Sequence, residues 1–298
     1  MNESKKLRRS LIIAALALLV ALLSVSAATF AWYIYHTNVR TTEVKMSAGS
    51  SISLQISNAL DGPYSSATQM EEFKETLVPV STDSILGGFQ RVNTFETIRE
   101  NDRYRLIVKS FRPSEEVEYY KTSLYLRTSA MDLDIYLSRV GVEDGSEENP
   151  VSTAARLGLV IEGEDGKTQE FIYELNPEIN PAVDPNQTEY PIDNGMKDPR
   201  DGIVLKHDKT DGTTVDFTPL TKENMCEYHD DSDTCELKET STRICTISGD
   251  GKGDYGTPQK VDVYLWLEGC DRDCTLNLAG QTMELLALNF AGFAGEGA

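Results

Sequence analysis

The residues best suited to chemistry in this sequence are five cysteines, all in its C-terminal third. Two short segments, CEYHDDSDTC and GCDRDC, each place two of them close enough to close a local loop. Five is an odd number, so at least one thiol either has no partner within a monomer or pairs outside it. We expect local disulfides that join Cys226 to Cys235 and Cys270 to Cys274, because export would permit them.

Zinc binding is the competing interpretation of the same thiols. Cys270 and Cys274 have a spacing that zinc sites use, and His229 lies between Cys226 and Cys235. The pattern nevertheless fits no standard zinc knuckle. The sequence therefore assigns no metal ligands, and the zinc alternative stays open.

Acidic turns and histidines are the remaining candidates for chemistry. The turns SGDGKGDYG and HDDSDTCE offer the carboxylate oxygens that Ca²⁺ prefers, although neither has the spacing of an EF-hand loop. His36, His207 and His229 are the only histidines, and the sequence contains no HExxH, GxSxG or P-loop motif. We expect a protein that is not an enzyme and has no resident cofactor, with Ca²⁺ as an alternative.

The net charge limits the class of partner. The chain of 298 residues carries a formal charge of −20. A body of this charge repels phosphate backbones, so nucleic acid is excluded as a partner.

The first 36 residues are predicted to be a signal or anchor segment. Four basic residues precede an uncharged run from Leu11 to Tyr35, and Leu11 to Leu23 has the length of a signal-peptide core. Small residues follow, so that a signal peptidase could cut near Ala27 or Ala28. In this interpretation the mature chain is secreted or held at the cell surface.

The same run also fits a permanent membrane anchor. As a helix it would span roughly 37 Å, enough to cross a hydrocarbon core of about 30 Å. Phe30, Trp32 and Tyr35 would then lie near the outer interface, where aromatic residues collect. Both interpretations place the following residues outside the cell membrane, because the basic residues come first.

Residues 37–298 are predicted to form one extracellular β domain with long polar loops. Alternation of apolar and polar residues, as at Leu124, Leu126, Leu133, Ile135 and Leu137, is typical of half-buried strands. Two hairpins are expected around Asp165–Gly166 and Asp211–Gly212, since this residue pair favours tight turns. Further strands are expected in residues 52–57, 103–113, 259–269 and 282–293, and one short helix in 68–78. The pattern predicts an antiparallel β-sandwich preceded by one N-terminal apolar helix.

The junction ATFAWYIYHTNVRTTEVKMSAGSSISLQIS resembles the N-terminal region of the exported camelysin and TasA-type proteins of Gram-positive bacteria. The resemblance covers about the first 57 residues and extends more weakly to the paired strands of residues 123–138. It implies a jelly-roll-like sandwich and a role in surface fibres or biofilm matrix. The chain has no zinc-protease motif to carry over from camelysin.

We therefore expect a non-enzymatic structural or assembly protein of the cell surface, such as a matrix fibre subunit. Its partners would be the membrane, through the N-terminal segment, and further copies or other surface proteins. After cleavage, the segment ATFAWYIYHT could pair with a sheet edge of the next subunit. The alternative is a membrane-tethered module that binds carbohydrate or peptide.

Overall fold

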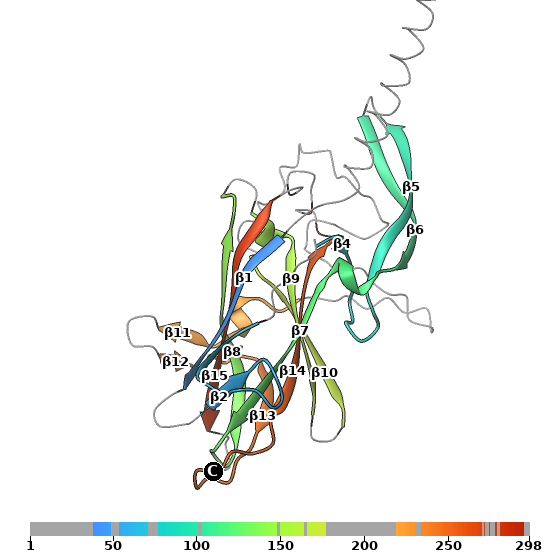
Figure 1. Cartoon of the computed structure of the whole chain (residues 1–298). Helices are drawn as coiled ribbons and strands as arrows, with labels where there is room; N and C mark the ends of the chain where they lie inside the picture. Colours follow the sequence, from blue (N-terminus) through green and yellow to red (C-terminus); the bar gives the residue numbers. More distant parts are fainter. Residues whose placement is uncertain are drawn as a thin grey trace, which may run out of the picture.

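A computed structural model describes residues 38–48, 54–70, 77–100, 103–147, 150–163, 166–176, 219–229, 234–269, 271, 274, 278 and 281–294. The described residues are mainly β structure, and most strand pairs are antiparallel, as predicted. Two large sheets face each other in the body of the molecule, and a long hairpin stands apart from them (Figure 1).

The first large sheet, sheet I, holds five strands. Their order is β13 (Arg243–Ile247), β8 (Leu133–Asp144), β15 (Thr282–Ala294), β1 (Asn38–Ala48) and β3 (Ala67–Gln69). The first and last described strands, β1 and β15, lie side by side and run parallel. No crossover helix is needed for this pair, because the whole of the intervening chain forms the connection.

The second large sheet, sheet II, follows the order β10 (Thr168–Glu174), β9 (Ala155–Glu162), β14 (Gln259–Glu268), β7 (Tyr120–Thr128) and β2 (Leu54–Ser57). The two-residue strand β4 (Pro79–Val80) adds to β14 in parallel. β9 and β10 form the hairpin expected from the sequence, and Gly166 in its turn has a φ of 72°, a conformation that glycine adopts without strain.

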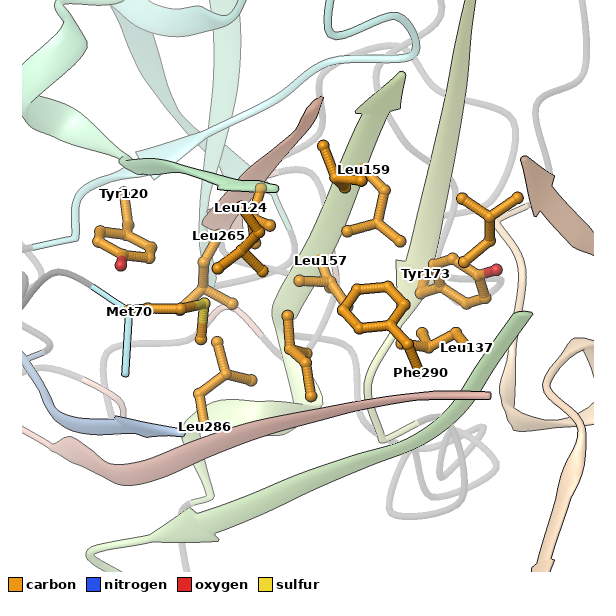
Figure 2. Packing of buried hydrophobic residues seen from close by; sticks show 14 of the residues in the cluster. Met70, Tyr120, Leu124, Leu137, Leu157, Leu159, Tyr173, Leu265, Leu286 and Phe290 are labelled. Atoms are coloured by element: carbon orange, nitrogen blue, oxygen red, sulfur yellow. The ribbon is translucent and has the colours of Figure 1, made fainter. Parts of the chain in front are cut away.

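The main core fills the space between the two sheets. Alternate residues of facing strands meet there, and Figure 2 shows Leu124, Leu157 and Leu265 of sheet II opposite Leu286 and Phe290 of sheet I. Each such side chain contributes about 1.5–3 kcal/mol on full burial. This packing fixes which face of each strand points outward.

A second, smaller core covers part of the outer face of sheet II. Residues 77–90 lie across that face, so that Ile85 and Phe89 pack on Tyr264 and Trp266 of β14. Gly158 of β9 permits the close approach, since a Cβ there would lie 2.5 Å from Cδ1 of Ile85. The rest of the outer face of sheet II, along β7 and the start of β14, is partly exposed.

The long hairpin consists of β5 (Gln90–Glu100) and β6 (Arg103–Pro113), which form a two-stranded sheet, and Gln90 at its base forms a further bridge with Ser81. Its base is joined to the body by Glu118 of the short 3₁₀ helix η1 (Glu116–Glu118). The Glu118 carboxylate accepts hydrogen bonds from Arg91 and, at 3.1 Å, from Arg112.

The remaining described elements are short. A small hairpin pairs β11 (Glu227–His229) with β12 (Thr234–Glu236), and two further 3₁₀ helices are η2 (Val151–Thr153) and η4 (Lys222–Asn224).

Several predictions from the sequence can be compared with these elements. The strands expected in residues 52–57, 103–113, 259–269 and 282–293 are confirmed as β2, β6, β14 and β15, with residues 52 and 53 outside the described part of the chain. The alternating residues from Leu124 to Leu137 lie in two strands, β7 and β8. The short helix expected in 68–78 is wrong for residues 68 and 69, which belong to β3 and pair with β1. The N-terminal apolar helix and the hairpin around Asp211–Gly212 lie outside the described residues.

Candidate functional site

Several residues singled out in the sequence lie outside the described part of the chain. These are the membrane-segment residues Leu11, Leu23, Phe30, Trp32 and Tyr35, the cleavage candidates Ala27 and Ala28, and Cys270, His36 and His207. Among the residues that the structure does describe, no helix has the length and apolarity needed to span a bilayer.

The structure brings Cys226 and Cys235 together. Cys235 lies on β12 directly opposite Tyr228, and Cys226 immediately precedes β11. The two thiols are in hydrogen-bonding contact, and this contact, together with burial, raises the pKa of Cys226. Cys226 is also held by its backbone N–H, which donates to the Leu137 carbonyl at 3.1 Å.

The other described cysteines are Cys245 and Cys274. Cys245 lies on β13 against the main core, where burial raises the pKa of its thiol to about 12. Cys274 is buried, and its backbone N–H donates to the Asp271 carbonyl at 3.2 Å. The predicted bridge from Cys274 to Cys270 is not described and stays a prediction.

In the acidic turn SGDGKGDYG, the first carboxylate, that of Asp250, forms hydrogen bonds within the turn itself. One oxygen of Asp250 accepts hydrogen bonds from the backbone N–H groups of Lys252, Gly253 and Asp254 at 2.8–3.0 Å. These bonds lower the pKa of Asp250. Among the described residues, no three His, Cys, Asp or Glu side chains gather closely enough to hold a metal ion.

A buried charge network closes one end of sheet II. Arg156 of β9 is fully buried and forms ion pairs with Asp271 and, at 3.3 Å, with Glu174. Glu268 is also buried nearby and accepts a hydrogen bond from the Trp266 indole at 3.1 Å. Burial opposes the charge of Arg156, but these three carboxylates outweigh it and raise its pKa.

The position of this network indicates a structural role. Asp271 follows β14, and its backbone N–H donates to the Glu268 carbonyl, so the ion pair to Arg156 fastens the start of the GCDRDC segment to the sheet. Trp266, the only tryptophan outside the N-terminal segment, is fully buried here and offers no exposed stacking surface.

A cleft, which we call the β7 cleft, opens on the outer side of sheet II. It has a volume of about 470 Å³, within the range of small-molecule sites, and its walls come from the loop after β2 and from β7. It is lined by Asn58, Ala59, Leu60, Lys121, Thr122, Ser123 and Tyr125.

An aromatic platform continues from the cleft along β7. The Arg127 guanidinium lies 3.9 Å from the ring centre of Tyr64 and 4.4 Å from that of Tyr255. Gln55 of β2 holds the same guanidinium by accepting two hydrogen bonds of 2.8 and 3.0 Å. The guanidinium is thus held by two tyrosine rings and by Gln55.

The sequence contained one signal of this surface. Lys121, Ser123, Tyr125 and Arg127 alternate with the apolar residues of the predicted strand, so they had to share its outer face. Tyr64 and Tyr255 lie in loops far away in the chain, and only the fold places them on either side of Arg127.

Comparison with known proteins adds no assignment to these features. No family model, no curated protein and no solved structure matches the chain.

Proposed function

We propose that the chain is a non-enzymatic structural protein of the cell surface, built on a jelly-roll-like β-sandwich and able to assemble into a matrix fibre. The uncharged N-terminal run supports export, with the body outside the membrane and the run acting as an anchor or a cleaved leader.

The observation that carries the assembly proposal is the open edge of β1. β3 pairs with β1 only from Glu43 to Lys45, and no described strand pairs with the rest of that edge. An unpaired edge offers backbone N–H and C=O groups to an added strand. The segment ATFAWYIYHT leads directly into β1, so cleavage near Ala27 would release a β-rich segment beside such an edge.

The test compares two soluble chains that differ only at their start. One begins at Ala28 and keeps the segment, while the other begins at Asn38, where β1 starts. Light scattering and negative-stain electron microscopy should show filaments for the first chain and monomers for the second. If both remain monomeric at high concentration, the assembly proposal fails and the anchor interpretation of the segment is favoured.

The second candidate function is a tethered module that binds carbohydrate or peptide. The β7 cleft favours it, because the cleft combines a defined volume with convergent polar groups.

A further inference from the structure

The β7 cleft exists because β2 is short. β2 pairs with β7 only over Tyr125–Thr128, and after Ser57 the chain turns away from the sheet. In the described part of the chain, no strand therefore pairs with this side of β7 from Lys121 to Leu124. Thr122 is buried against the core yet borders the cleft, so it offers mainly backbone to the cavity.

The wall formed by the turning loop is held in shape by its own contacts. The backbone N–H of Ala59 donates to the Ser57 hydroxyl at 3.2 Å, and that of Gly62 donates to the Ala59 carbonyl at 3.1 Å. The Tyr64 hydroxyl donates to the Leu60 carbonyl at 2.9 Å. The cleft is thus largely formed before any ligand arrives, which lowers the entropic cost of binding.

Two polar side chains of the cleft lining, Ser123 and Asn58, are held in fixed positions. The Ser123 hydroxyl donates to Asp262 at 2.5 Å, and Lys260 holds the same carboxylate at 2.7 Å. The Asn58 amide N–H₂ group donates to the Gln69 carbonyl at 2.9 Å, and the amide oxygen is an acceptor.

A cation and an aromatic ring complete the lining. The Lys121 ammonium contacts the hydroxyl of Tyr264 and lies 5.3 Å from the centre of its ring. The half-buried ring of Tyr125 borders the cleft beside the Tyr64–Arg127–Tyr255 platform.

This lining selects among ligand classes. It contains too little apolar surface for a lipid or a drug-like apolar molecule, and opposite charges stand side by side, which suits neither a polyanion nor a metal ion. A pyranose ring presents hydroxyl groups at its rim and a weakly positive C–H face. The hydroxyl groups fit a lining of mixed hydrogen-bond donors and acceptors. The C–H face fits the negative face of an aromatic ring.

We propose that the β7 cleft binds a pyranose oligosaccharide of a cell-surface glycan, with Tyr125 as the stacking residue and Ser123, Asn58 and Lys121 as hydrogen-bonding groups. This assignment deepens the second candidate function and does not depend on filament assembly.

The test uses the full chain in lipid nanodiscs, which avoid detergents with sugar headgroups. Tetrasaccharides of glucose (β1,4 and α1,4), N-acetylglucosamine and mannose serve as separate probes in saturation-transfer NMR and titration calorimetry. At least one should bind, with contacts on its ring C–H protons. Light scattering on the same samples measures assembly. A failure to bind sugar can therefore be distinguished from a failure to assemble.

Matched variants locate the site. Tyr125→Ala should weaken binding at least tenfold, while Tyr125→Phe, which keeps the ring, should stay within about threefold of the parent protein. Ser123→Ala should weaken binding several-fold, and Tyr228→Ala, which removes a half-buried tyrosine from β11, should leave it unchanged.

Three results would overturn the proposal. These are no binding of any tetrasaccharide, binding that survives both Tyr125→Ala and Ser123→Ala, or capture of an extended peptide at the free edge of β7 that excludes the sugars.

Discussion

At the scale of single residues, the cysteines are the clearest case in which structure sharpened a prediction. The two disulfides expected from the sequence use four of the five thiols and leave Cys245 without a partner. The structure puts Cys226 in contact with Cys235, and it places Cys245 on β13 against the core, where burial raises the pKa of its thiol. Cys245 is therefore the residue that we expect to remain a thiol.

We predict that oxidised glutathione converts the Cys226 and Cys235 thiols into an intramolecular disulfide and is itself reduced to glutathione. Contact between the two sulfur atoms makes the second exchange step intramolecular. Mass spectrometry of a non-reduced digest should find the two cysteine peptides joined, and Cys245→Ser should leave this pair unchanged. A bridge from Cys226 to any other cysteine would contradict the prediction.

The buried arginine gives a second prediction at this scale. Arg156→Met should lower the free energy of unfolding by about 3–5 kcal/mol, because Asp271 and Glu174 would stay buried without their counter-charge. Urea unfolding followed by Trp266 fluorescence measures the change.

Two comparisons control this experiment. Arg139→Met, at an exposed site on β8, should cost less than about 1 kcal/mol. Adding Asp271→Asn to Arg156→Met should restore part of the loss, and an unchanged stability of Arg156→Met would show that the network contributes nothing.

At the scale of elements, alternation of apolar and polar residues predicted the strands that pack one face on the core. Leu133, Ile135 and Leu137 of β8 and Val261, Val263 and Leu265 of β14 are all fully buried, as their spacing required. The helix expected in 68–78 failed at its start, because pairing with β1 overrides weak local helix propensity.

Other features could not be read from the sequence. On the outer face of β14, Tyr264 and Trp266 are buried by residues 77–90, a segment with little periodicity. The β7 cleft and its platform likewise depend on contacts between segments far apart in the chain. The local pattern of apolar and polar residues does not predict such contacts.

The β5–β6 hairpin should loosen in acid. Burial opposes ionisation of Glu118, but hydrogen bonds from the Glu115 backbone and from Arg91 outweigh it, so the pKa of Glu118 lies below its ordinary value of 4.5. Such a group stabilises the fold above pH 4.5, and this contribution is lost as the pH falls through the lowered folded pKa.

Hydrogen exchange across β5 and β6, measured from pH 7 downward and corrected for the intrinsic rate, should show protection falling below pH 4.5. Glu118→Gln should reduce protection at pH 7 and flatten this dependence, because the hydrogen bonds to a charged group are worth about 1.5–3 kcal/mol. The same acid profile in the variant and the parent protein would contradict the role of Glu118.

At the scale of the whole molecule, the charge of −20 opposes contact between copies. If the chain starting at Ala28 forms filaments, their growth should accelerate as salt is raised to about 0.15 M, where the Debye length falls to roughly 8 Å. Light scattering measures the rate, and the chain starting at Asn38 should stay monomeric at every salt concentration. A rate that falls with added salt would show that attractive charge pairs, rather than edge pairing, join the copies.

The parallel pairing of β1 with β15 has a consequence for how the molecule folds. These strands come from opposite ends of the described chain, so sheet I cannot be completed until the last strand is present. Contacts this distant in sequence carry a large loop-closure cost and are typical of slow folders with high contact order. A chain threaded through a membrane from its N-terminus would thus lack the β1–β15 pairing until its last strand has crossed. The chain would stay in the extended form that threading requires, and folding would be delayed until it reaches the far side.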